Sequence, residues 1–171
     1  MASKLLWDIS NIDFDKITAS IEDVRNVNPQ RYEMEQVTAI VFESREDNIC
    51  VGYKDVTRDE FWVRGHMPSM PLMPGVVMLE AAAQISAYFA QKYDILGAQM
   101  IGFGGLEKVR FRGPVIPGDR LILLSQLQKF RRGRMIISRF QGVVKENIVV
   151  EGYLKGIPIP VDMLSQNTTS D

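Results

Sequence analysis

The order of apolar and polar positions along the chain predicts two strands, one long helix and then four more strands. Apolar residues recur through residues 32–44 and 48–57, and the charged turn 45–47 separates these two runs. After Gly97, strand-like runs cover residues 100–111, 120–130, 134–145 and 148–157, with glycine, proline or polar turns between them. Consecutive strands joined by tight turns predict an antiparallel sheet.

A long helix is predicted to follow Pro74. Alanine, leucine and methionine, which favour helix, are frequent in residues 76–90, and the run is too long for an ordinary strand. Only Glu80, Gln84 and Ser86 interrupt its apolar surface. A helix that is apolar nearly all round is buried on nearly all sides. We therefore expect an α+β fold in which a six-stranded antiparallel sheet wraps around this helix, and a second copy of the chain covers what one sheet leaves open.

The length of 171 residues fits one domain. We expect an N-terminal extension over residues 1–17, one domain over residues 18–162 and a flexible tail over residues 163–171. Ser20, followed by Asp23 three residues later, is typical of a helix start, so a short helix is predicted over residues 18–26.

Composition narrows the functions that are open to the chain. The 20 lysines and arginines balance 21 aspartates and glutamates, which argues against a globally basic nucleic-acid-binding protein. A single cysteine, Cys50, excludes a disulfide scaffold, and a single histidine, His66, leaves almost nothing for a zinc site. We therefore expect no nucleic-acid partner, no metal and no cofactor. No apolar core follows Lys4 and no run is long enough to span a membrane, so we expect a cytoplasmic chain without a signal peptide.

The residues suited to chemistry are concentrated between residues 65 and 84. A proline at every third position from residue 68 to residue 74 excludes a helix there and predicts an extended loop, which begins beside His66. The helix that follows carries Glu80. Histidine is the natural base near neutral pH, a carboxyl group in an apolar setting tends to keep a proton that it can donate, and free N–H groups at a helix start can bind developing negative charge. Together these groups suit proton abstraction next to a carbonyl, with protonation of a leaving group.

Each of these residues also has a purely structural interpretation. His66 beside a glycine can be an ordinary loop residue, and Glu80 can be paired with an arginine. Gln84 lies one turn after Glu80 and is expected to orient its carboxylate rather than to do chemistry. The nearby methionines, Met67 among them, suit soft packing or the lining of an acyl tunnel better than a metal site.

This segment closely resembles the signature of the (3R)-hydroxyacyl-[acyl-carrier-protein] dehydratases of the FabZ type. The matching residues read Gly65-His66-Met-Pro-x-x-Pro-x-x-Pro-Gly75-Val-x-x-Leu79-Glu80-Ala-x-Ala-Gln84. Residues 29–32 resemble the family's early Pro-His-Arg-Tyr, and residues 110–119 resemble its Arg-Phe-x-x-Pro-Val-x-Pro-Gly-Asp. The resemblance extends over residues 20–155, with the motifs in the same order.

The resemblance implies a hot-dog fold and a homodimer, or a trimer of such dimers, with the active site at the dimer interface. By this resemblance His66 would take a proton from C2 of the substrate, and Glu80 of the partner subunit would protonate the departing 3-hydroxyl. The backbone N–H of Gly75 would hold the thioester carbonyl. A glutamate at position 80 resembles the plain dehydratase, whereas an aspartate marks the related FabA type, which also isomerises the double bond.

The partner implied by the resemblance is acyl carrier protein, an acidic protein that delivers its substrate on a phosphopantetheine arm. A basic patch is therefore expected on this chain. The candidates for docking are Lys108, Arg110, Arg112, Arg131, Arg132 and Arg134, each of which also suits an ordinary solvated surface. Met67 and Phe103 are expected along the acyl tunnel, with core packing as the alternative for Phe103.

The chain departs from the family pattern outside the pair formed by His66 and Glu80. Gln30 stands where the family has its early histidine, and Glu33 stands where it has a proline. Thr38 and Ala39 replace a common Asp-Arg, and Met67 replaces a phenylalanine. Two other functions stay open: a non-catalytic module that binds acyl thioesters or senses lipids, and a thioesterase or a dehydratase of another pathway. The presence of both His66 and Glu80 argues against the pure binding module, which has no need of a buried acid.

Overall fold

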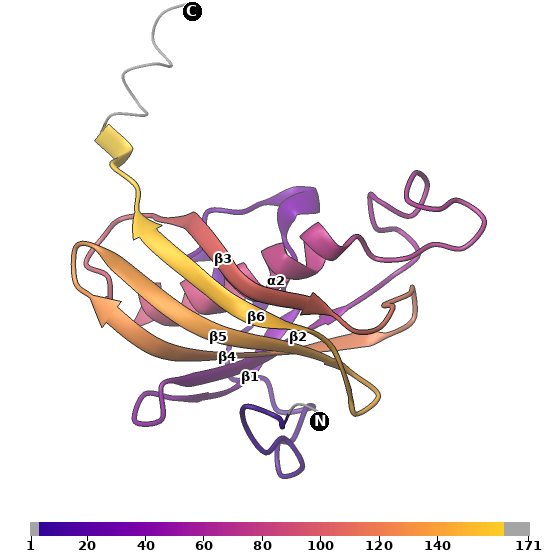
Figure 1. Cartoon of the computed structure of the whole chain (residues 1–171), viewed down its shortest axis with the longest axis horizontal. Coiled ribbons are helices and arrows are strands. Elements are labelled where there is room, and N and C mark those ends of the chain that lie inside the picture. Colours follow the sequence, from indigo (N-terminus) through magenta and orange to yellow (C-terminus); the bar gives the residue numbers. More distant parts are fainter. Residues whose placement is uncertain (1–3, 163–171) are drawn as a thin grey trace, which may run out of the picture.

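The computed structural model describes residues 4–162, which form one antiparallel sheet curved around one long helix, α2 (Gly75–Lys92) (Figure 1). The strands are β1 (Ala39–Ser44), β2 (Ile49–Asp55), β3 (Ile101–Phe111), β4 (Arg120–Arg131), β5 (Met135–Val144) and β6 (Asn147–Pro158). The helix α1 (Ile21–Arg25) and the 3-10 helix η1 (Tyr32–Met34) precede them. The expected α+β architecture is confirmed, while the tail expected over residues 163–171 lies outside the described residues. Within the described part of the chain, no helix is long and apolar enough to cross a membrane.

The sheet is not a simple succession of hairpins. Its strand order is β1-β2-β4-β5-β6-β3, with all neighbours antiparallel. Strand β3 lies at the far edge beside β6, although β4 follows it in the chain. Strand β3 therefore has one neighbour in the sheet and presents its other side as an edge.

The strand predicted over residues 32–44 is wrong in its first half. Tyr32 has a φ of 56° and opens the 3-10 turn η1, and the regular strand begins only at Ala39. The backbone N–H of Gln36 donates to the side-chain oxygen Oε1 of Gln84 at 2.8 Å rather than to a neighbouring strand. The other predicted strands agree within two residues at each end, and the capping box of Ser20 and Asp23 is confirmed at the start of α1.

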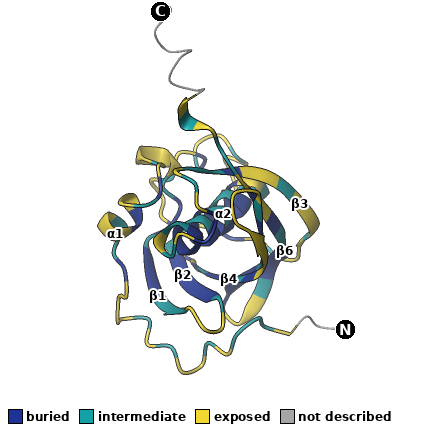
Figure 2. Ribbon diagram, turned by 90° about the vertical axis from the view of Figure 1, so that its left-hand side faces the viewer, coloured by how far each residue is buried: buried dark blue, intermediate teal, exposed yellow. Residues whose placement is uncertain are grey.

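Helix α2 is buried on nearly all sides, and the concave face of the sheet curves around it (Figure 2). Ala81, Ala82 and Ile85 are at most 1% exposed. The close contact also needs glycine on the sheet, because a Cβ added at Gly52 would lie 2.9 Å from Ile85 Cδ1. Burying one large aliphatic side chain contributes about 1.5–3 kcal/mol, so the apolar surface of this helix is a main source of stability.

The outer face of the sheet carries a second apolar cluster, which the N-terminal segment covers. The cluster includes Val41, Val51, Tyr53, Leu124 and Val143. Leu5, Leu6, Trp7, Ile9, Ile12 and Phe14 pack against it. Figure 1 shows this segment on the side of the sheet opposite to α2.

Hydrogen bonds anchor this N-terminal segment to the sheet. Gln141 of β5 is fully buried, and its Oε1 accepts from the Leu6 N–H at 2.8 Å while its Nε2 donates to the Lys4 carbonyl at 3.0 Å. The Trp7 ring stacks on Phe42 with the ring centroids 5.6 Å apart. Residues 4–17 therefore add a packed layer to the sheet.

Replacing Trp7 with alanine is expected to lower the free energy of unfolding by about 1–3 kcal/mol, because it removes the stacked ring and opens the outer cluster to water. Urea unfolding followed by circular dichroism measures the change. The matched control is Ile17→Ala, which alters a residue of the same segment that is 45% exposed. Equal stabilities of the Trp7→Ala protein and the wild type would contradict the packing described here.

Candidate active site

His66 lies in the loop that leads into α2, and backbone bonds hold its position. Its N–H donates to the Trp62 carbonyl at 2.7 Å, and farther along the loop the Met73 N–H donates to the Val115 carbonyl at 2.8 Å. The ring atom Nδ1 lies 2.7 Å from the Leu72 carbonyl oxygen. A carbonyl only accepts, so Nδ1 carries the hydrogen and, in the neutral ring, Nε2 is left with a free lone pair. The loop therefore leaves the lone pair of His66 Nε2 available to accept a proton.

The start of α2 offers unpaired N–H groups. Pro74 is the N-cap residue, and its carbonyl accepts from the N–H groups of Val77 and Met78. The Gly75 N–H has no acceptor among residues 4–162. A Cβ at Gly75 would lie 2.8 Å from the exposed Phe111 ring, so a larger residue would displace that ring. This N–H is available to a carbonyl oxygen of a ligand.

Glu80 is half-buried in the second turn of α2, and two side-chain amides hold its carboxylate. Its Oε1 accepts from Gln84 Nε2 at 2.8 Å and from Gln30 Nε2 at 3.3 Å. No lysine, arginine or histidine of residues 4–162 forms an ion pair with it. The structural alternative of an arginine partner is therefore not seen within the described chain, and Oε2 is the oxygen that the amides leave open.

Gln84 has a fixed orientation that makes it a donor to Glu80. Its Oε1 accepts from the Gln36 N–H at 2.8 Å, so its Nε2 must face the other way, where it reaches Glu80 and the Met34 carbonyl. Asn28 Nδ2 also donates to the Gln84 carbonyl at 2.9 Å. Gln36 and Gln84 are 1% and 2% exposed, so water does not compete for these bonds.

Sequence reasoning missed the contribution of residues 28–36 to this site. Asn28 and Gln36 had no assigned role, and Gln30 was noted only as a departure from a family pattern. Their one signal was the concentration of amide side chains just after α1, which apolar periodicity does not weigh.

A narrow, mainly apolar pocket of about 100 Å³ begins at Glu80 and runs between α2 and strands β3, β5 and β6. It is lined by Gln30, Glu80, Ala83, Ser86, Ala87, Ile101, Gly102, Phe103, Ile136, Ser138, Leu154, Lys155 and Gly156. Its alanines and glycines leave a slot suited to an unbranched chain. Phe103 thus lies where a tunnel residue is expected, whereas Met67 does not line this pocket and is 49% exposed in its loop.

The structure does not bring His66 and Glu80 together within one chain. Glu80 lines the narrow pocket and a second one beside Val76 and Phe61, and His66 lines neither. No hydrogen bond joins the two side chains in the described residues. In the described part of a single chain, His66 and Glu80 therefore share neither a pocket nor a hydrogen bond.

The six candidate docking residues are all exposed but lie at opposite ends of the sheet. One group lies at the end of β3, beside the start of β6: Lys108, Arg110 and Arg112. The other group lies in the β4–β5 turn, near the end of β6, at residues 131–134. Arg112 forms an ion pair with Glu151, and Arg132 forms one with Asp94. The six candidate docking residues therefore form two separate basic clusters in one chain rather than a single patch.

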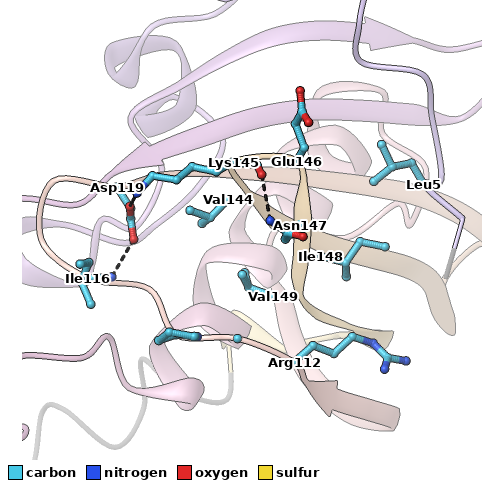
Figure 3. Close-up of a pocket in the computed structure, with 12 residues that line it drawn as sticks. Leu5, Arg112, Ile116, Asp119, Val144, Lys145, Glu146, Asn147, Ile148 and Val149 are labelled. Carbon is cyan, nitrogen blue, oxygen red and sulfur yellow. Dashed lines mark hydrogen bonds and ion pairs between the residues drawn. The ribbon is translucent and has the colours of Figure 1, made fainter. Parts of the chain in front are cut away.

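A larger surface pocket, of about 660 Å³, lies between the loop after β3 and the β5–β6 turn (Figure 3). Lys145 and Asp119 form an ion pair at 3.3 Å in its wall, and Asp119 also accepts from the Ile116 N–H. None of His66, Glu80 and Gln84 lines it. Its size alone therefore does not make it the catalytic site.

Cys50 is poorly suited to act as a nucleophile. The side chain is fully buried, and burial raises the pKa of its thiol well above the ordinary value. A buried neutral thiol is a poor nucleophile.

Comparisons with known proteins agree with this geometry. Residues 28–153 match the family model of the FabA-like domain. A 3-hydroxyacyl-[acyl-carrier-protein] dehydratase FabZ of Desulfotalea psychrophila is 38% identical over 136 residues, which cover 78% of this chain and 89% of that protein. The FabZ of Clostridium botulinum is 35% identical over 134 residues, covering 78% of this chain and 92% of the relative.

Solved structures support the fold. The dehydratase heterocomplex ApeI:P of Xenorhabdus doucetiae aligns with a TM-score of 0.67 at 17% identity, covering 86% of this chain and 97% of the other. The PaaI protein of E. coli aligns with a TM-score of 0.54 at 16% identity, covering 69% of this chain and 80% of the other. The hot-dog fold expected from the sequence is confirmed. The family match and the curated relatives together show that this chain belongs to the FabA-like family and, within it, to the FabZ-type 3-hydroxyacyl-[acyl-carrier-protein] dehydratases.

Proposed function

We propose that this chain dehydrates (3R)-hydroxyacyl chains on acyl carrier protein to trans-2-enoyl chains, a cytoplasmic step of fatty-acid synthesis. The observation that carries the proposal is the setting of Glu80, the one acidic residue of α2. Its carboxylate is held by two amides at the end of a narrow apolar pocket. The names of the curated relatives agree with this reaction class.

The proposed reaction uses three groups. His66 Nε2 removes a proton from C2, and the electron pair moves toward the thioester carbonyl, whose oxygen the Gly75 N–H binds. The electrons then form the C2=C3 bond while the C3–O bond breaks. Glu80 gives its proton to the departing hydroxyl, so that one water molecule leaves. Holding base, acid and thioester in one arrangement removes much of the entropic cost of bringing them together.

A second copy of the chain completes the proposed site. Apolar side chains that a lone chain leaves exposed lie in the loop before α2, at the start of α2 and along β3; they are Met67, Met70, Val76, Phe103, Leu106 and Phe111. Exposed apolar surface of this kind marks an interface. The free side of β3 suits pairing with β3 of a second copy across a two-fold axis. In such a homodimer His66 of one chain faces Glu80 of the partner subunit.

The acidic carrier protein is proposed to dock on exposed basic residues. Lys108 and Arg110 form one candidate cluster at the end of β3, and Arg131 and Arg134 form another at the β4–β5 turn. Arg112 and Arg132 already have acidic partners within the chain and are the weaker candidates.

Replacing His66 with alanine or Glu80 with glutamine is expected to lower the dehydration rate by about 10²–10⁴-fold, because each change removes one proton-transfer group. The measurement follows the interconversion of (3R)-hydroxyhexanoyl- and trans-2-hexenoyl-acyl carrier protein by mass spectrometry. Near-normal rates for either variant would show that the assigned roles are wrong. The same assay separates other functions: a thioesterase releases free acid and thiol, and a pure binding module gives no new product.

Gln84→Met is expected to lower kcat by about 10- to 100-fold while changing KM little, because it removes a hydrogen bond to a charged group that orients Glu80 rather than one that binds the acyl chain. Steady-state kinetics measure the split between kcat and KM, and thermal melting checks that the variant folds. Gln128→Met, which changes an exposed glutamine of β4, is the matched control. An unchanged kcat for Gln84→Met would contradict the orienting role.

A further inference from the structure

The two polar atoms of the Gln30 side chain differ in their hydrogen bonding. Its side chain lines the pocket at the Glu80 end, and its Nε2 donates to Glu80 Oε1 at 3.3 Å. Its own Oε1 is buried and has no hydrogen-bond partner among residues 4–162. A buried acceptor without a donor is costly, by about 1–3 kcal/mol, and such an atom needs an explanation.

A molecule bound in the pocket can supply the missing donor. Beyond Gln30 and Glu80 the pocket is lined by apolar groups such as Ala83, Ile101 and Phe103. The side chains of the lining that carry a donor, Ser86, Ser138 and Lys155, form no hydrogen bond with Gln30 Oε1. Glu80 Oε1 already receives two N–H groups, so Oε2 is the oxygen that carries and delivers the proton. A ligand in the pocket can supply the donor that Gln30 Oε1 lacks, beside the proton on Glu80.

A hydroxyl group meets both requirements. Its oxygen accepts the proton of a carboxylic acid, and its hydrogen at the same time needs an acceptor. Gln30 and Glu80 are hydrogen-bonded neighbours, so one hydroxyl can lie between the open oxygen of each side chain.

We propose that Gln30 Oε1 accepts the hydrogen bond of the substrate's 3-hydroxyl while Glu80 donates to the oxygen of that hydroxyl. This role rests on the proposed function of the site. When the C3–O bond breaks, the hydroxyl takes the proton of Glu80 and leaves as water, and one hydrogen of that water still points to Gln30. Gln30 is thus the residue that distinguishes a 3-hydroxyacyl chain from a chain without the hydroxyl.

Binding of two pantetheine thioesters, (3R)-hydroxyhexanoyl and hexanoyl, tests the proposal. Isothermal titration calorimetry is done in a His66→Ala background, which slows turnover and leaves the Gln30–Glu80 pair in place. Adding Gln30→Met is expected to weaken binding of the hydroxyacyl thioester about five- to tenfold and to leave hexanoyl binding unchanged, because only the hydroxyl loses a partner. The matched control adds Gln128→Met instead, which changes an exposed glutamine of β4 and is expected to leave the binding of both thioesters unchanged.

Equal weakening of both thioesters by Gln30→Met, or no weakening of either, would overturn the proposal. Melting temperatures of the variants show whether equal weakening reflects a general loss of structure, which would also count against a specific hydroxyl contact. Failure of the proposed function has a different signature, since the wild-type protein would then not interconvert the hydroxyacyl and enoyl thioesters at all.

Discussion

One constraint shapes the site: a carboxylate has to be kept on a helix that is otherwise buried in apolar surroundings. Desolvating a charge is costly unless it is hydrogen-bonded, and this chain gives Glu80 amide donors instead of a cation. Gln84 comes from the helix itself and is held by the Gln36 backbone N–H, whereas Gln30 comes from the segment before the sheet. That segment forms a 3-10 turn rather than a strand because its backbone bonds to Gln84. Neutral donors hold the group while leaving it free to exchange a proton.

The same curvature that buries the helix creates the space for a substrate. The sheet approaches α2 closely at Gly52, and the narrow pocket opens where small residues face strands β3, β5 and β6. The opposite face of the sheet is closed by residues 4–17, with the buried amide of Gln141 as the anchor. Apolar surface is then left mainly on the loop before α2 and on edge strand β3, where a second copy would bring His66 to Glu80.

Much of this could be predicted from the sequence, because the strongest patterns are local. The apolar run after Pro74 predicted the long helix, and the regularly spaced prolines before it predicted the loop of His66. The turns between apolar runs predicted most of the strands. The placement of β3 beside β6 was not predicted, because strand order depends on long-range pairing. The strand predicted from residue 32 failed because Gln36 bonds to a side chain 48 residues away. The amide side chains around Glu80 were not predicted for the same reason, because they come together only after folding.

His66 and Glu80 are proposed to act across two chains, and a mixture of two inactive variants separates this arrangement from a site within one chain. In a His66→Ala/Glu80→Gln mixed dimer, one site lacks both groups and the other has both. Unfolding and refolding the two variants together in equal amounts is therefore expected to restore about a quarter of the wild-type dehydration rate, because half of the dimers are mixed and each has one complete site. Refolded mixtures that contain mixed dimers but stay as inactive as the separate variants would contradict the shared site.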